Sequence, residues 1–134
     1  MHTPAVRFRV DFGPDRAVGP GKIALLEQIA RGGSLSQAAR QLGMSYRRAW
    51  QLLASLNACF PEPVVVSAKG GRHGGGSILT GFGRQLVRVY RDFDAEVQRR
   101  AARRFGALSA PVHSGRGRAA VPVTRLKHRR RPSH

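Results

Sequence analysis

Two arginines and a glutamine lie in one short segment, at a spacing that lets their side chains act together. Arg47 and Arg48 are followed by Gln51, about one helical turn later. A guanidinium can donate two hydrogen bonds to O6 and N7 of guanine, and a glutamine amide can bond N6 and N7 of adenine. Arginines also bind phosphate alone, since phosphate and sugar take half to two-thirds of protein–DNA hydrogen bonds. We therefore expect one base-reading arginine rather than two.

The flanking residues predict a helix that projects these side chains. Ser45 is a favoured N-cap residue. The apolar side of the helix after it is formed by Ala49, Leu52, Leu53 and Leu56. Gly43 can take the left-handed conformation that ends a preceding helix, which begins near Ser36. The pattern predicts a helix-turn-helix over residues 36–58, whose second helix enters the DNA major groove.

Other polar residues of the motif are predicted to contact DNA. Ser36 and Gln37 begin the first helix, where free amides and the helix dipole suit phosphate. Ser45 points outward with the two arginines at the end of the second helix that reaches base edges, and the hydroxyl of Tyr46 can reach phosphate. For Trp50 we expect packing in the core rather than a base contact.

A short hairpin is predicted directly after the motif. Residues 64–69 are rich in β-branched side chains, residues 70–76 are rich in glycine, and residues 77–80 form a returning strand. This arrangement is typical of a winged helix-turn-helix, and Lys69, Arg72 and His73 are predicted to contact DNA from the wing. No Gly-Lys-Ser/Thr sequence follows, so the glycines do not indicate a nucleotide-binding loop.

Two further elements precede the motif, and one follows the wing. Apolar residues alternate over residues 6–12, which predicts a half-buried strand. A helix is expected over residues 22–31, ended by Gly32-Gly33. A long helix, capped by Thr80, is expected over about residues 81–104. The fold class is therefore mainly α with a small β-hairpin wing.

The long helix is predicted to be a dimerisation helix. It carries an apolar stripe at steps of three and four residues, and it exceeds what a small winged domain needs for its own core. Pairing with a second copy of the chain is an economical use of such a stripe. Packing on its own domain alone is the alternative. The residues predicted to dimerise are Leu86, Tyr90, Phe93 and Val97.

Charge divides the chain into two parts. Lys and Arg number 24 against 7 Asp and Glu, which gives a formal net charge of +17 on 134 residues. Such a chain seeks a polyanion. All acidic residues lie at or before Glu96. We expect a domain over residues 1–105 and a disordered basic tail over residues 106–134, acting as a solvated tail, a phosphate-binding arm or both.

Several classes of function find little support. The acids and the five histidines are scattered, so no catalytic pair, zinc site or other cofactor site is predicted. No long apolar run suggests a membrane span or a signal peptide. The single cysteine, Cys59, cannot form an internal disulfide, and it fits a reducing compartment. We expect a non-enzymatic protein in a prokaryotic cytoplasm, associated with the nucleoid.

The sequence resembles the N-terminal DNA-binding domain of the molybdate-responsive ModE regulators, relatives of the LysR winged domain. The likeness covers about residues 6–100. It is carried by the segments at residues 19–30, 33–39, 44–50, 70–76 and 79–83. Of these, Met-Ser-Tyr-Arg-Arg-Ala-Trp together with the glycine-rich wing is the most specific. The resemblance implies DNA binding and dimerisation through the long helix.

The resemblance does not imply molybdate binding. ModE regulators carry C-terminal oxyanion-binding domains, and the basic tail leaves no room for them, so the sequence identifies no small-molecule effector. The expected function is a homodimeric, sequence-specific regulator of transcription that binds double-stranded DNA. A nucleoid-type protein that coats nucleic acid through charge, and a module that pairs with another regulator, remain alternatives.

Overall fold

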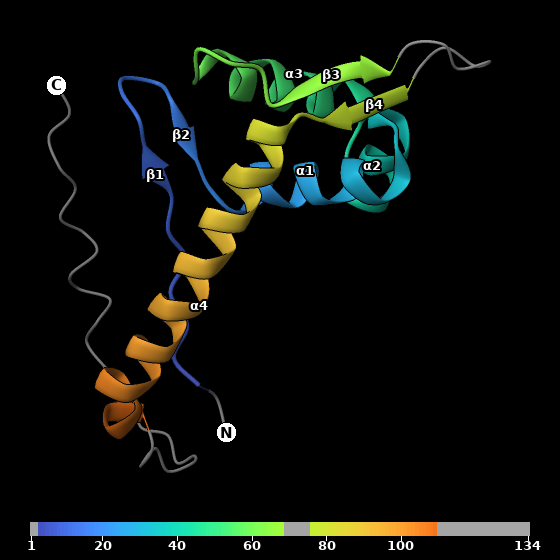
Figure 1. Cartoon of the computed structure of the whole chain (residues 1–134). Coiled ribbons are helices and arrows are strands. Elements are labelled where there is room, and N and C mark those ends of the chain that lie inside the picture. The colour runs from blue at the N-terminus through green and yellow to red at the C-terminus, as the bar shows by residue number, and fades with distance from the viewer. Residues whose placement is uncertain (1–2, 69–75, 110–134) are drawn as a thin grey trace, which may run out of the picture.

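The computed structural model describes residues 3–68 and 76–109. Four helices and two short hairpins follow one another, and the last helix extends away from the rest (Figure 1). In chain order the elements are β1 Val10–Asp11, β2 Ala17–Val18, α1 Pro20–Gly32, α2 Leu35–Gln41, α3 Tyr46–Ala58, β3 Val65–Ala68, β4 Gly76–Leu79 and α4 Gly81–Ser109. The predicted class, mainly α with a small hairpin and a long C-terminal helix, is confirmed.

Helix α1 is the centre of the core, and it contacts α2, α3, α4 and β4. Its apolar residues are fully or almost fully buried: Ile23, Leu25, Leu26 and Ile29. Burying one such side chain stabilises the fold by about 1.5–3 kcal/mol. The ammonium of Lys22 donates to the carbonyl oxygen of Ala17 at 2.7 Å and to the hydroxyl of Ser55 at 3.0 Å, which ties α1 to α3.

Helix caps fix the turns of the motif, at Gly43 and Ser45 as predicted and also at Ser34. Gly33 and Gly43 have φ angles of 75° and 68°, the left-handed conformation that favours glycine. Ser34 caps α2, and Ser45 caps α3 by accepting a hydrogen bond from the Arg48 amide at 3.0 Å. Helix α2 therefore begins at Leu35, one residue earlier than predicted, because Ser34 supplies the capping hydroxyl.

The second hairpin joins the motif to α4. Strands β3 and β4 pair antiparallel, with Val65 opposite Leu79, and both side chains are buried. Thr80 caps α4, because its hydroxyl accepts from the Gly83 amide at 2.9 Å. A Cβ at Gly83 would overlap the carbonyl oxygen of Val64, so the glycine permits the close approach of α4 to the residue that precedes β3.

The N-terminal segment corrects the predicted strand over residues 6–12. Only Val10–Asp11 pairs with another strand, Ala17–Val18. Burial nevertheless alternates from Thr3 to Val10, and the segment lies beside α4 (Figure 1). The period-two pattern correctly indicated that one face of the segment is buried. Most of that face packs against helix α4 rather than against a β-sheet.

Helix α4 is longer than predicted. It ends at Ser109 rather than near Arg104, so its 29 residues span about 43 Å. The sequence near residue 105 offers no helix-ending proline, and Gly106 continues the helix. Residues 106–109, which fell in the predicted tail, are therefore helical, and residues 110–134 lie outside the described part of the chain.

Candidate nucleic-acid interface

Helix α3 has one buried side and one exposed side, set by the cap at Ser45. Ala49 and Leu56 are fully buried, and Leu52 and Leu53 are half-buried against the core. The opposite side is open to solvent. We call its exposed residues the α3 face: Tyr46, Arg47, Arg48, Trp50 and Gln51.

The α3 face is electropositive. Helix α3 contains no Asp or Glu. The ion pairs among the described residues involve Arg9 and Arg91 and none of the basic residues of α3. The N-terminus of a helix adds a partial positive charge of roughly half an elementary charge. Arg47 and Arg48 lie in this first turn, so the face presents free donors and positive charge to an anion.

Trp50 corrects the sequence-based prediction. Its side chain is 55% exposed, and Tyr46 is exposed to the same extent. Trp50 follows the buried Ala49 directly, and one residue is 100° around a helix, so the ring turns away from the core. The position of Trp50 around the helix, next to the buried Ala49, indicated that the ring is exposed, whereas its hydrophobicity suggested burial.

Helix α2 places its predicted contact residues near the end of α1. Ser36 and Gln37 both lie in the exposed first turn. The amide of Gln37 donates to the Ser34 hydroxyl at 3.0 Å, and its side chain lies against Gly32, where it would meet any Cβ. The Gln37 side chain thus covers the last turn of α1, whereas Ser36 is exposed to solvent.

The wing residues Lys69, Arg72 and His73 lie outside the described residues. The strands that lead to them are defined, with Ala68 opposite Gly76. The Ser77 amide donates to the Gly33 carbonyl at 2.9 Å, which anchors the hairpin to the end of α1. Val66 and Ile78 are opposite each other and exposed, so the hairpin has one buried and one open side.

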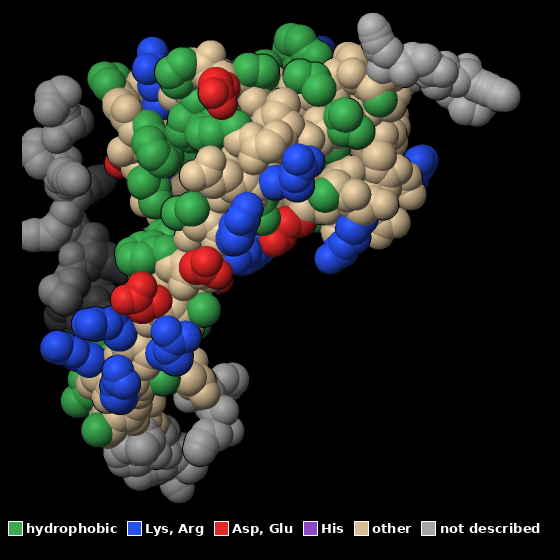
Figure 2. All heavy atoms as spheres, viewed as in Figure 1, with side chains coloured by type: hydrophobic (Ala, Val, Ile, Leu, Met, Phe, Trp, Pro, Cys, Tyr) green, Lys and Arg blue, Asp and Glu red, His purple; other side chains and the backbone are tan. Residues whose placement is uncertain are grey.

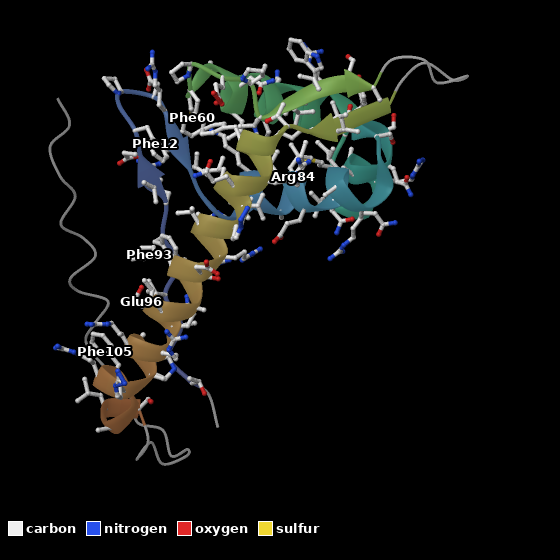
Figure 3. The ribbon with its side chains drawn as sticks, in the orientation of Figure 1. Phe12, Phe60, Arg84, Phe93, Glu96 and Phe105 are labelled. Carbon is white, nitrogen blue, oxygen red and sulfur yellow. The ribbon has the colours of Figure 1, made fainter. Side chains whose placement is uncertain are left out.

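The residues predicted to dimerise divide into two groups. Leu86 packs against the core. Tyr90 is 5% exposed, stacks on Phe8 and donates its hydroxyl to the Phe8 carbonyl at 2.9 Å. Phe93, labelled in Figure 3, is 47% exposed and meets Phe8 edge-on. Leu86 and Tyr90 are therefore used largely within their own chain, whereas Phe93 keeps an open side.

Val89 belongs to the apolar stripe of this helix, but it is not among the residues predicted to dimerise. Val89 is 58% exposed and precedes Phe93 by one helical turn. Val97, a further turn along, is half-buried. These three residues share one side of α4, and we call them the α4 face.

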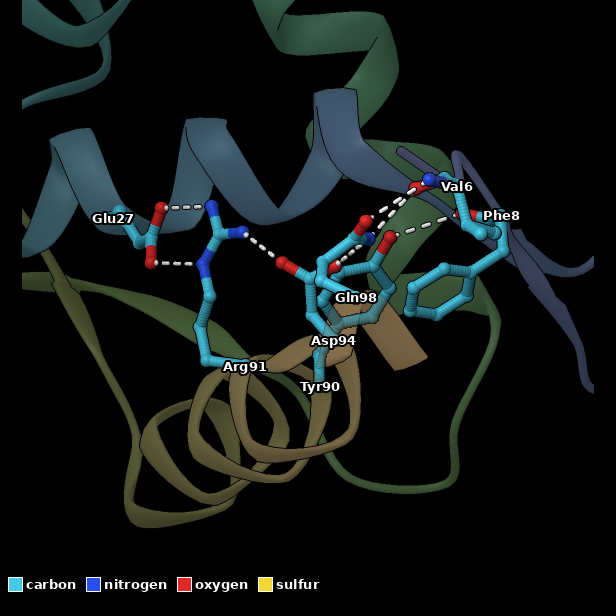
Figure 4. A network of polar contacts seen from close by, with 7 residues as sticks. All are labelled: Val6, Phe8, Glu27, Tyr90, Arg91, Asp94 and Gln98. Carbon is cyan, nitrogen blue, oxygen red and sulfur yellow. Dashed lines mark hydrogen bonds and ion pairs between the residues drawn. The ribbon is translucent and has the colours of Figure 1, made fainter. Parts of the chain in front are cut away.

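A polar network holds α4 against the domain and against the N-terminal segment (Figure 4). Arg91 makes a two-pronged pair with Glu27 of α1, at 2.7 and 2.8 Å, and also reaches Asp94 at 3.2 Å. The Arg91 hydrogen bonds lower the pKa of the Glu27 carboxyl, although partial burial opposes them. The pKa of Arg91 is raised in turn by its bond to Glu27.

Gln98 continues this network and is the main polar anchor that sequence reasoning missed. Its amide oxygen accepts from the Val6 amide at 2.9 Å, and its nitrogen donates to the Val6 carbonyl at 2.8 Å. The same nitrogen donates to Asp94 at 2.8 Å. The side chain thus takes the place of a neighbouring strand for the N-terminal segment.

Burial raises the pKa of the nearby Tyr90, and the Asp94 charge adds to this.

Charge is uneven along α4. Figure 2 shows acidic side chains in its middle and a group of Lys and Arg side chains near its far end. The exposed basic residues of that end are Arg99, Arg100, Arg103 and Arg104.

In the described part of the chain no helix is long and apolar enough to cross a membrane.

Comparison with known proteins shows what this chain is similar to. Residues 21–84 match the family described as bacterial regulatory helix-turn-helix protein, lysR family. "Molybdenum transport protein ModE" of Azotobacter vinelandii is 41% identical over 92 residues, covering 69% of this chain and 34% of that protein. "DNA-binding transcriptional dual regulator ModE" of Escherichia coli K12 is 40% identical over 90 residues, covering 67% and 33%.

A third relative bears a different name. "Molybdenum-pterin-binding protein MopB" of Rhodobacter capsulatus is 42% identical over 80 residues, covering 60% of this chain and 30% of that protein. The chain thus spans about a third of the length of these relatives. The helices and the second hairpin agree with the match of residues 21–84 to a LysR-type helix-turn-helix domain, and this part of the chain is similar to the N-terminal part of ModE proteins.

Proposed function

We propose that this protein is a sequence-specific regulator that inserts α3 into the major groove of double-stranded DNA. One observation carries the proposal: Arg47, Arg48 and Gln51 are exposed together on a capped helix, within a LysR-type helix-turn-helix domain. Arginine and glutamine at the N-terminal part of such a helix reach base edges. One of the two arginines reads guanine, and the other binds phosphate.

The remaining predicted contacts bind the backbone around the groove. Ser36 lies in the first turn of α2, where unpaired amides and the helix dipole favour phosphate. Tyr46, at the first position of α3, offers a hydroxyl. The wing, with Lys69, Arg72 and His73, binds the backbone or the minor groove. These contacts position the domain, and the groove contacts specify the sequence.

A homodimer through α4 completes the proposal. Val89 and Phe93 are large, apolar and exposed on a helix that extends beyond the core. Contact between two copies would cover this face. The operator of such a dimer is an imperfect palindrome, with half-sites about 34 Å apart or a multiple of that distance. The site of action is the bacterial cytoplasm and its nucleoid.

The alternative is a nucleoid-type protein that binds nucleic acid through charge, and the net charge of +17 favours it. Selection from a random duplex library, followed by titration of the recovered duplex against random DNA of equal length, separates the two. Sequence-specific binding predicts a preference of at least about a thousand-fold. Equal affinity for both duplexes would support the nucleoid-type function instead.

A further inference from the structure

Two aromatic side chains lie together on the α3 face. Tyr46 and Trp50 are four residues apart and therefore neighbours on one side of the helix. Each is 55% exposed. Aromatic side chains bury about 150–250 Å² and dominate the energetics of many interfaces. The pair is a substantial apolar surface on the helix that also carries Arg47 and Gln51.

We propose that Trp50 is a specificity residue that reads the methyl group of thymine. This inference rests on the proposed function, because it needs α3 in the major groove. Thymine alone among the four bases presents a methyl group there, and this group is recognised by apolar contact. The indole ring offers that contact. The hydrogen-bonding side chains Arg47 and Gln51 lie three residues before it and one residue after it.

The surroundings of Trp50 favour DNA over a protein partner. Helix α3 has no acidic residue, and the two arginines beside the ring have no ion-pair partner among the described residues. A polyanion therefore complements the face in charge. The α4 face differs, because acidic side chains lie beside its apolar residues: Asp92, Asp94 and Glu96.

The test removes one methyl group at a time from the DNA. Each thymine of the duplex selected by the wild-type protein is replaced by uracil, and the affinity is measured for wild type, Trp50→Ala and Trp50→Phe. One methyl group contributes on the order of a four-fold change in affinity. The affinity of wild type should fall about four-fold at one or two adjacent thymines, and Trp50→Phe should keep part of this penalty.

Trp50→Ala should bind the thymine and uracil duplexes equally at those positions. Phe105→Ala is the matched control, because Phe105 is 53% exposed on α4, far from α3 in the chain, and should keep the full uracil penalty. Circular dichroism checks that Trp50→Ala is folded. Little unfolding is expected, because the ring is largely outside the core.

Three outcomes would overturn the inference. The first is a wild type that tolerates uracil everywhere, and the second is a Trp50→Ala variant that keeps the same uracil penalty. The third is a uniform reduction of affinity in Trp50→Ala, which indicates packing on the sugar–phosphate backbone. The proposed function would still stand after any of these three outcomes if Arg47→Ala or Arg48→Ala relaxes the base preference. A wild type that prefers no duplex over random DNA overturns both proposals.

Discussion

Helices α3 and α4 each leave large hydrophobic side chains exposed, but in different chemical settings. On the α3 face, Tyr46 and Trp50 lie among arginines and a glutamine near a helix N-terminus. On the α4 face, Val89 and Phe93 lie mid-helix beside acidic residues. Exposure alone therefore does not identify a partner. The neighbouring donors and charges favour DNA for the first face and a second copy of the chain for the second.

The largest expected effect concerns the α4 face. Val89→Asp should dissociate the proposed dimer, because an uncompensated charge buried in an interface costs about 3–5 kcal/mol. The dissociation constant should rise by more than about a hundred-fold. Light scattering and sedimentation over a range of concentrations measure it. Val89 suits this test better than Phe93, since Phe93 also contacts Phe8 of its own chain.

The control for this variant is Val66→Asp, which places the same charge on an exposed valine of β3. The molecular mass of Val66→Asp in solution should equal that of the wild-type assembly. An unchanged mass in Val89→Asp, or a wild type that is monomeric at micromolar concentration, would show that the α4 face has another role.

A second prediction concerns the junction that holds α4 in place. Gly83→Ala puts a methyl group against the Val64 carbonyl oxygen, and overpacking of this kind costs about 1–3 kcal/mol. The backbone at Val64 cannot move aside easily, so we expect a free-energy cost near the upper end of this range. Thermal unfolding measures the decrease in stability.

Gly106→Ala is the matched control for Gly83→Ala, because a Cβ at Gly106 would meet nothing within 4 Å. Alanine should stabilise this helical position by about 0.5–1 kcal/mol. Equal unfolding temperatures for the two variants would contradict the close approach at Gly83.

The third prediction concerns residues 110–134, which contain Lys and Arg but no acidic residue. Their removal should weaken binding to the selected duplex and to random DNA by similar factors. The slope of log affinity against log salt should shrink by about 0.9 for each DNA phosphate that the shortened chain no longer neutralises. Titrations at several salt concentrations measure both quantities. A weakening confined to the selected duplex would show that this segment reads sequence.

The smallest effect is expected at the pair between α1 and α4. Arg91 lowers the pKa of the Glu27 carboxyl in the folded state. This pair therefore stabilises the fold above the unfolded pKa of Glu27, and its contribution is lost as the pH falls through the folded pKa. Partly exposed pairs contribute about 0.2–1 kcal/mol.

Urea unfolding at about pH 7 and about pH 3 tests this pair. Glu27→Gln should be less stable than wild type at the higher pH, and the difference should vanish at the lower pH. Asp11→Asn is the control, since Asp11 pairs with Arg9 where both side chains are largely exposed. A Glu27→Gln deficit that is equal at both pH values would assign the effect to packing.

The sequence predicted those features that depend on neighbouring residues. Gly43, Ser45 and Thr80 end or begin helices through their own backbone freedom or hydroxyl groups, so the turns were readable. The packing of the N-terminal segment was harder to predict from the sequence. Its alternation indicated a covered face, but the cover comes from Tyr90 and Gln98, more than 80 residues away in the chain.

The candidate site was predictable to a similar degree. The exposure of Arg47, Arg48 and Gln51 followed from the helical period. The exposure of Trp50 did not, because hydrophobicity and angular position disagreed there, and only the packing of Ala49 and Leu56 in the core decides between them.

The most direct test of the central claim is competition titration of every single-base variant of the selected duplex. The proteins compared are wild type, Arg47→Ala, Arg48→Ala and Arg104→Ala. Removing the guanine-reading arginine should cost about 1–3 kcal/mol and relax the preference at one base pair. Arg104→Ala removes an equal charge from the far end of α4 and should leave every preference intact. Full base preference in both α3 variants would contradict the reading of DNA by this helix.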